Sequence, residues 1–438
     1  MSAVLLDPMI AAPAVLGVTY AAVMSERVNR AIAALLGAGA MIALGVLDQR
    51  GAVGFIDFNT IALLTGMMLI VAVTRRSGVF QFVALWSAKR VKADPAALLA
   101  VFQLVTALFS ALLDNVTTVL LMTRVVLVIA EELEVPPWPF LVGLILAANI
   151  GGIATLVGDP PNILIGSAAG LGFNDFIAAL APIVVAMEAC VILVLHLVWG
   201  RRLAAPVAAK TRVMAFDAKE AIGDRRLLVW SLAVIALVVT AFVLARPLGL
   251  EPGTIALTGA ALLMLVEGMG RPAASRTELA HATFAEIDWV TIFFFVGLFV
   301  VVGGVEVTGL LRLLARALAA STGGGLAPTA FTILAGSAGL SAVVDNIPFV
   351  AAMIPVVKSL GPQFGGAAHL RPLWWALSLG ACLGGNGTLI GASANLAVAG
   401  LAERAGHPVR FWPFLAVSLP LTLMTLAVAA LGLWLFLL

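Results

Sequence analysis

Four short polar segments interrupt long apolar stretches of the sequence, and each places chemically useful side chains there. One pair is Asp114-Asn115-Val116-Thr117-Thr118 and Asp345-Asn346-Ile347-Pro348-Phe349; the other is Gly158-Asp159-Pro160-Pro161-Asn162 and the stretch from Gly384 to Asn395. Carboxylate and amide oxygens, with carbonyls freed where a helix breaks, suit a small cation, while helix N-termini offer N–H groups to an oxygen-bearing substrate. We therefore predict a substrate and ion site formed by Asp114, Asn115, Thr117, Thr118, Asp159, Asn162, Asp345, Asn346, Asn386, Thr388, Ser393 and Asn395.

The aspartates in these segments have two interpretations. Asp114 and Asp345 each precede an apolar stretch, where an aspartate commonly caps the following helix. A carboxylate near the bilayer centre costs at least about 2.5–3.5 kcal/mol, more than the ~1 kcal/mol that a cap typically contributes, so we expect both residues to exchange an ion or proton. For Asp159, a Gly-Asp-Pro-Pro turn is an equally good interpretation, and its counterpart in the second half of the chain is Ala392.

Other polar residues in the apolar stretches weigh less as candidates. Cys382 is a lone cysteine, for which packing is the usual role, and Glu188 and Glu306 lack a charged partner nearby in the sequence. Asp57 and Asp288 open apolar stretches, where we expect them to cap helices. The four histidines fall at the ends of these stretches or in loops, where solvation is the default.

The composition shows what must position these segments. The chain has 438 residues, 62% of them hydrophobic and 11% charged, with a mean hydropathy of +1.12. An ordinary soluble domain has about 25% charged residues, so the lipid bilayer must surround most of this fold. Two cysteines exclude a disulfide scaffold and give no metal-ligand spacing. No basic patch interleaved with aromatic residues indicates a nucleic-acid partner.

The apolar stretches predict an all-α polytopic membrane protein with ten transmembrane helices, because they are continuous and lack the alternation of membrane β-strands. We expect them at 9–24, 30–48, 58–74, 138–168, 177–199, 227–245, 253–269, 288–304, 371–400 and 411–437. The first is expected to be a retained span, since the N-terminus lacks the pattern of a signal peptide. The stretches 95–131 and 327–360 contain Asp-Asn near their middle and are predicted to be re-entrant helical hairpins.

An internal repeat divides the chain into two related halves. Asp114-Asn115 matches Asp345-Asn346 at an offset of 231 residues, as Gly66 matches Gly297; at an offset of 233, Gly151-Gly152 matches Gly384-Gly385 and Asn162 matches Asn395. We predict a first repeat over 1–199, a linker over 200–226 and a second repeat over 227–438. Because each repeat has an odd number of crossings, the second should be inverted, with a broken helix in each and the site between them near the midplane.

The orientation follows from the basic residues, which favour cytoplasmic loops. With the linker 200–226 placed inside, 19 of the 25 lysines and arginines lie on the cytoplasmic side. We therefore expect a multi-pass protein of the bacterial inner membrane with a cytoplasmic linker and periplasmic termini.

The motifs also resemble those of a known superfamily. Ala111 to Thr118, Asn149 to Gly152, Gly158 to Asn162, Asp345 to Pro348 and Leu383 to Asn395 resemble the ion-transporter superfamily. It includes arsenite permeases, the melanosomal P protein, plant silicon-efflux transporters, NhaD-type sodium–proton antiporters and, more distantly, sodium–dicarboxylate symporters. The match is best to the P-protein and arsenite-permease branch. The resemblance implies a homodimer in which a transport domain moves against a scaffold as an elevator. In the dicarboxylate branch the hairpin tips are typically Ser-Asn-Thr, from which Asp114 and Asp345 depart.

These observations favour secondary transport and leave the solute open. Carboxylates in a desolvated site would repel a divalent anion unless they were neutralised, so a neutral oxyacid or monovalent cation fits more easily. The leading hypothesis is proton-coupled efflux of arsenite, antimonite or a similar small inorganic oxyacid; the alternative is sodium–proton antiport, so the coupling ion is H⁺ or Na⁺ and no other cofactor is expected. Transport of a dicarboxylate or another anion, a passive channel, and an intramembrane hydrolase with paired aspartates are remoter alternatives; we expect no enzyme.

Overall fold

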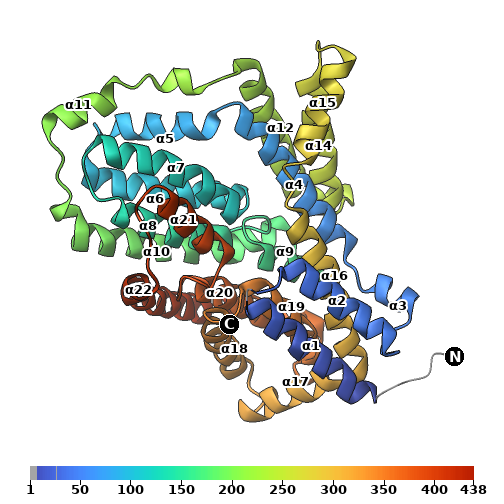
Figure 1. Cartoon of the computed structure of the whole chain (residues 1–438). Coiled ribbons are helices and arrows are strands. Elements are labelled where there is room, and N and C mark those ends of the chain that lie inside the picture. The colour runs from blue at the N-terminus through green and yellow to red at the C-terminus, as the bar shows by residue number, and fades with distance from the viewer. Residues whose placement is uncertain (1–6, 26) are drawn as a thin grey trace.

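The computed structural model describes residues 7–25 and 27–438, and the regular structure in these ranges is helical (Figure 1). The first half contains α1 (Pro8–Met24), α2 (Arg30–Ala43), α3 (Gln49–Gly54), α4 (Phe58–Arg76), α5 (Val79–Arg90), α6 (Pro95–Leu112), α7 (Asn115–Glu132), α8 (Trp138–Ile153), α9 (Pro160–Ala169) and α10 (Phe173–Trp199). The linker carries α11 (Val207–Ala215). The second half contains α12 (Arg225–Val243), α13 (Ala245–Leu248), α14 (Pro252–Gly268), α15 (Ala273–Phe284), α16 (Trp289–Thr308), α17 (Leu310–Ser321), α18 (Leu326–Ser341), α19 (Asn346–Ser359), α20 (Arg371–Gly384), α21 (Ser393–Arg404) and α22 (Phe411–Gly432). The predicted all-helical class is confirmed.

Each predicted span coincides with one or two helices. Within the described residues, six helices are long and apolar enough to cross a bilayer, and five of them, α4, α10, α12, α16 and α22, are predicted spans. The sixth, α6, is the first arm of the hairpin predicted at 95–131, and the pair α17–α18, bent by 115°, is a broken span or a re-entrant loop. Four further predicted spans correspond to the shorter apolar helices α1, α2, α8 and α14. The predicted span 371–400 is divided between α20 and α21.

The polar segments separate successive helices, as the sequence predicts. Asp114 separates α6 from α7, and Asp345 separates α18 from α19, so each Asp-Asn pair forms the tip of a helical hairpin. Residues 154–159, the first break, separate α8 from α9, which begins at Pro160-Pro161; residues 385–392, the second break, separate α20 from α21. Proline suits the first turn of a helix because its missing N–H has no partner there in any case. Asp57 and Asp288 cap α4 and α16, as expected.

The two halves are interleaved. Helix α2 packs against α16 and α4 against α14; likewise α9 packs against the second hairpin's α19, and α21 against the first hairpin's α7. The matched glycines explain two of these crossings. A Cβ on Gly66 would lie 2.5 Å from the carbonyl carbon of Ala256, and one on Gly297 would lie 2.5 Å from that of Ala34. Small residues allow such close backbone approach between membrane helices.

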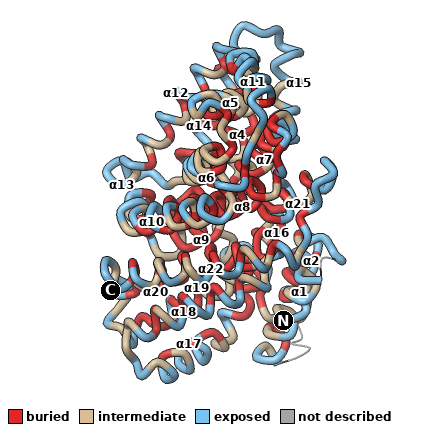
Figure 2. The backbone as a smooth tube through the Cα atoms, turned by 90° about the vertical axis from the view of Figure 1, so that its left-hand side faces the viewer, coloured by how far each residue is buried: buried red, intermediate tan, exposed pale blue. Residues whose placement is uncertain are grey.

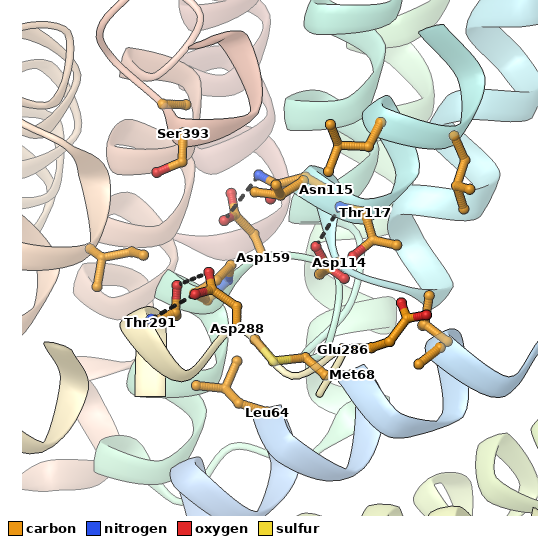
Figure 3. Close-up of a pocket in the computed structure, with 18 of the residues that line it drawn as sticks. Leu64, Met68, Asp114, Asn115, Thr117, Asp159, Glu286, Asp288, Thr291 and Ser393 are labelled. Atoms are coloured by element: carbon orange, nitrogen blue, oxygen red, sulfur yellow. Dashed lines mark hydrogen bonds between the residues drawn. The ribbon is translucent and has the colours of Figure 1, made fainter. Parts of the chain in front are cut away.

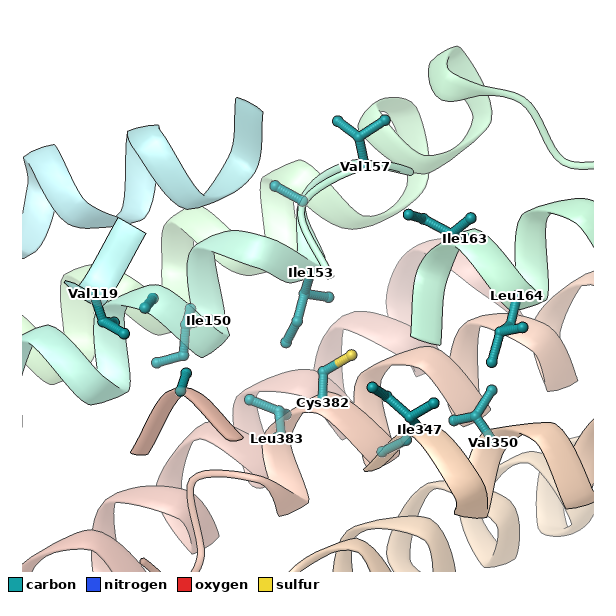
Figure 4. Packing of buried hydrophobic residues seen from close by; sticks show 14 of the residues in the cluster. Val119, Ile150, Ile153, Val157, Ile163, Leu164, Ile347, Val350, Cys382 and Leu383 are labelled. Carbon is teal, nitrogen blue, oxygen red and sulfur yellow. The ribbon is translucent and has the colours of Figure 1, made fainter. Parts of the chain in front are cut away.

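The buried centre of the molecule lies where the breaks meet the hairpins. Every residue of α8 after Trp138 is buried, and Figure 2 shows burial concentrated in the middle of the fold, with the linker and α15 exposed at one end. Ile163 and Leu164 of α9, and Ile347 and Val350 of α19, belong to one apolar cluster there (Figure 4). This dry packing fixes the helix ends that carry the polar segments.

Some helices were not anticipated. The stretch between the predicted span 58–74 and the predicted hairpin 95–131 contains α5, and α17 follows α16 in the same way in the second half. Each of the two helices is preceded by a glycine with positive φ, Gly78 at 80° and Gly309 at 81°. Both helices have 12 residues, which is too short to produce the ~20-residue apolar signal of a span.

Candidate functional site

A cavity between the two halves is lined by residues of α2, α4, α7, α9, α16, α19 and α21; we call it the central cavity (Figure 3). Of the predicted site residues, it brings together Asp114, Asn115, Thr117, Asp159, Asn346 and Ser393. Three arginines line it as well, Arg30, Arg75 and Arg124, together with Glu286, Asp288 and Thr291. The site therefore combines acidic, basic and hydrogen-bonding side chains from distant parts of the chain.

Asp159 is the most unusual residue in this cavity. Asp159 is only 1% exposed to solvent. Its Oδ1 accepts a hydrogen bond from Asn115 Nδ2 at 3.3 Å. Oδ2 is buried and has no hydrogen-bond partner among the described residues. The side chain does not cap α9, although it occupies the N-cap position. A structural turn therefore does not account for its carboxylate, and a buried charge without a partner is costly.

The hairpin aspartates differ in their surroundings. Asp114 caps α7, with Oδ1 accepting a hydrogen bond from the Thr117 N–H at 2.7 Å, and it also lines the central cavity. Asp345 caps α19 and lines a neighbouring cavity instead, where its Oδ2 accepts a hydrogen bond from Ser393 Oγ at 3.0 Å. The capping interpretation therefore holds geometrically for both residues. It does not exclude ion binding, because each carboxylate also faces a cavity.

Asn149 connects the two halves and was missed as a site residue by sequence reasoning. Its Oδ1 accepts a hydrogen bond from Asn115 Nδ2 at 3.2 Å, while its Nδ2 donates to Asn386 Oδ1 at 2.8 Å and Asn395 Oδ1 at 2.9 Å. All four asparagines are buried. A signal was present, since Asn149 is an amide within the otherwise apolar α8.

The matched residues Asn162 and Asn395 hold the breaks in shape. Asn162 Nδ2 donates to the carbonyls of Gly152, Ile153 and Thr155, and Asn395 Nδ2 donates to those of Gly385 and Thr388. Neither residue lines the central cavity. Their amides therefore satisfy carbonyls that the broken helices leave free, which is a positioning role.

The remaining predicted residues lie around this centre. Thr388 Oγ1 donates to the Ala342 carbonyl, which joins the second break to the second hairpin, as Thr155 joins the first break to the first hairpin through the Ala111 carbonyl. Thr118 is buried, and its hydroxyl has no partner among the described residues. Asn386 is buried against Asn149. The described residues contain no group of three or more His, Cys, Asp or Glu side chains that could hold a metal ion.

Arg30 is the second residue that the sequence did not single out. It begins α2, and its guanidinium donates hydrogen bonds to Thr291 Oγ1 at 2.6 Å and Ser393 Oγ at 3.0 Å. Asp288 and Asp345 each lie 3.6 Å from it as ion-pair partners. Arg30 is the first residue of the predicted span 30–48, a position where a cation normally faces the loop and solvent.

The comparisons with known proteins agree with a membrane transporter. The chain is 44% identical over 420 residues to Uncharacterized transporter Rv2684 of Mycobacterium tuberculosis, covering 95% of this chain and 96% of that one. It is 30% identical over 502 residues to the P protein of Homo sapiens, covering 95% of this chain and 58% of that one.

Solved structures share the fold at low sequence identity. The Alcanivorax borkumensis YdaH transporter, described as having an unusual topology, matches with a TM-score of 0.62 at 17% identity over 98% of both chains. Neisseria gonorrhoeae MtrF, described among antimetabolite efflux pumps, matches with a TM-score of 0.59 at 12% identity, covering 100% of this chain and 96% of that one. A family model described as citrate transporter (CitMHS) matches residues 20–380, and the chain therefore belongs to this family of membrane transporters.

Proposed function

We propose that the chain is a secondary active transporter in which Asp159 exchanges H⁺ or Na⁺ while a small polar solute occupies the central cavity. The supporting observation is the buried Oδ2 of Asp159, which has no partner among the described residues in a cavity lined by both halves. Such a carboxylate is stable only when it is protonated or paired with a cation. Asn115 Nδ2 donates a hydrogen bond to Oδ1, so one oxygen of this carboxylate is held in place while Oδ2 remains available for H⁺ or Na⁺.

A neutral oxyacid such as arsenous or antimonous acid is the preferred solute. The cavity offers Asn115, Thr117, Asn346 and Ser393 as hydrogen-bonding partners for hydroxyl groups. Two of its arginines are already paired, Arg75 with Glu286 and Arg30 with Asp288, so Asp114 and Asp159 would repel a divalent anion. Proton-coupled efflux of such an oxyacid is consistent with these charges, and sodium–proton antiport would use the same carboxylates.

Transport of an organic anion is the second candidate, and Arg124 favours it. This arginine lines the central cavity, and no carboxylate among the described residues lies within ion-pair distance of it. The family description names citrate. With Asp114 and Asp159 protonated or bound to cations, Arg124 would be the contact for a carboxylate of the solute.

The movement that we propose is an elevator, supported by the helix pairing. Helices α2, α4, α14 and α16 pack in pairs as the scaffold, while the two hairpins and two breaks pack together as the transport domain. The same proposal includes a homodimer in the bacterial inner membrane, with the linker 200–226 on the cytoplasmic side. The largely exposed linker helix α11, which carries Lys210 and Arg212, is compatible with that placement.

The test is transport by purified protein in liposomes under an imposed pH or sodium gradient. Arsenite, antimonite, Na⁺ and citrate are compared as solutes, and Asp159→Asn is compared with Asp48→Asn, an exposed cap of α3 outside the cavity. We expect gradient-driven uptake of one solute that Asp159→Asn abolishes and Asp48→Asn preserves. Full gradient-driven transport by Asp159→Asn would exclude the proposed role.

A further inference from the structure

A second cavity adjoins the central cavity, and the two share only two lining residues. The second cavity lies between the α1–α2 turn, the tip of the second hairpin and the start of α21; its lining includes Met24, Asn29, Val344, Asp345 and Leu396. Arg30 and Ser393 line both cavities, and Arg30 Nη1 donates a hydrogen bond to Ser393 Oγ at 3.0 Å. The contact between Arg30 of α2 and Ser393 of α21 therefore forms part of the wall between the two cavities.

The contact belongs to a chain of polar groups that connects α2 and α16 with α21 and the second hairpin. Arg30 is anchored on α16 by Thr291 and Asp288, and it reaches across to Ser393 on α21 and Asp345 at the tip of the second hairpin. Ser393 in turn donates to Asp345 Oδ2 at 3.0 Å. Loss of the guanidinium would remove every one of the Arg30 links at once.

The arrangement has no equivalent in the other half of the fold. Ala34 of α2 packs against Gly297 as Ala256 of α14 packs against Gly66, so the two helices occupy matched positions. Arg30 lies four residues before Ala34, and the residue four positions before Ala256 is Pro252. A proline cannot form these hydrogen bonds, and α14 packs against α4 without them. The close packing of α2 against α16 therefore does not in itself require Arg30.

We propose that Arg30 is a positioning residue that latches the second hairpin and α21 to α16, and that its release joins the two cavities. Two hydroxyl contacts and two ion pairs at 3.6 Å make the latch reversible, because partly exposed ion pairs are worth only about 0–1 kcal/mol. Release exposes the central cavity along the α1–α2 side. This inference rests on the proposed function, in which the cavity holds the solute.

The test is a distance measurement between spin labels across the second cavity. In a protein with Cys190→Ala and Cys382→Ala, labels are placed at Val28→Cys and Leu396→Cys, positions that are exposed and line this cavity. Double electron–electron resonance then compares the parent with Arg30→Gln, Arg30→Lys and Asp345→Asn. Arg27→Gln is the matched control, because it removes an exposed arginine from the same turn.

The latch predicts a single narrow distance distribution in the parent and in Arg27→Gln. In Arg30→Gln the narrow distribution should be replaced by a population at longer label-to-label distance. Asp345→Asn should show this longer population only in part, and Arg30→Lys should keep more of the narrow population than Arg30→Gln does. An unchanged distribution in Arg30→Gln would overturn the latch. Asp159→Asn separates the two proposals, since it should abolish transport without altering this distance. Normal transport by Asp159→Asn would contradict the proposed function alone, and the latch would still be judged by the distances.

Discussion

Arg30 Nη1 and Asp345 Oδ2 lie 3.6 Å apart, although one residue begins the second helix of the chain and the other caps α19. Asp345 therefore has a cationic partner, whereas the Oδ2 of Asp159 has none among the described residues. The two hairpin aspartates are also unequal, because Asp114 lines the central cavity and Asp345 lines the second cavity. Residues that match in the internal repeat therefore lie in different electrostatic surroundings.

Substitution of the hairpin aspartates by asparagine should separate their roles. Asn keeps the size and can still cap a helix, but it cannot titrate or bear a charge. We expect Asp114→Asn and Asp345→Asn to fold and to lose their response to a pH or sodium gradient, with the larger loss in Asp114→Asn because it lines the central cavity. Gradient-driven transport in liposomes measures both, with solute exchange at zero gradient as the control. If the single and double variants transport like the parent, both aspartates act only as caps.

Removal of the break asparagines should destabilise the fold as well as impair transport. Asn162→Ala and Asn395→Ala each leave buried carbonyls without their donor, at a cost of about 1–3 kcal/mol per unsatisfied group. We expect a lower melting temperature in detergent for both variants. Asn174→Ala is the control, because Asn174 donates a single hydrogen bond at an exposed position. Equal melting temperatures for the three variants would show that the breaks do not depend on these amides.

Much of the fold could be predicted from the sequence because its main signals are local. The length of the apolar stretches predicts the helices. The Asp-Asn pairs and the Pro-Pro pair predict where helices begin and end, as at Asp114 and Pro160. The match of Gly66 with Gly297 is part of the evidence for an internal repeat. Only the structure shows that each glycine packs against a helix of the other half. Such pairing depends on three-dimensional contacts, which no local pattern contains. Helix α5 was missed because it is too short to resemble a span.

The sequence predicts the types of residue that form the site, but only some of the individual residues. The polar segments named Asp159 and Asn115, which do meet, because polar groups in apolar stretches stand out. Arg30 was overlooked because a cation at a span end is normally solvated, and its four partners come from three other elements. Asn162 and Asn395 look like ligands in sequence, yet their amides are used by nearby carbonyls. Sequence shows which groups are polar, but not which ones remain unpaired after folding.

The helix crossings predict a strong contrast between two glycine substitutions. A Cβ at Gly66 would approach backbone atoms of Ala256 and Leu257 to within 2.6 Å, so Gly66→Ala must push α14 away from α4. Overpacking of this kind typically costs about 1–3 kcal/mol. Gly17→Ala in α1 is the matched control, since nothing lies within 4 Å of its added Cβ, and it should be neutral or slightly stabilising. Thermal unfolding in detergent compares the two, and an equal effect would contradict the close α4–α14 crossing.

The linker is held to the first hairpin by an ion pair whose contribution depends on pH. Lys210 Nζ lies 2.9 Å from Asp94 Oδ1, at the N-terminus of α6. Burial raises the pKa of Asp94, but the hydrogen bond and charge of Lys210, with the N–H groups of Ala97 and Ala96, outweigh burial and lower the pKa below the ordinary 3.8. The lowered pKa means that this stabilisation is fully present above the unfolded value of about 3.8 and is lost as pH falls through the folded value.

We therefore expect α11 to become more mobile when the pH falls below about 3.8, and Lys210→Met to produce similar mobility at neutral pH. The effect should be small, about 0.2–1 kcal/mol, because both side chains are partly exposed. Limited proteolysis within 207–215 measures it, since cleavage follows the population of the undocked linker. Lys219→Met is the control, because it removes an exposed lysine from the same linker without breaking this pair. If Lys210→Met and Lys219→Met are cleaved at the same rate, the Asp94–Lys210 pair does not hold the linker in place.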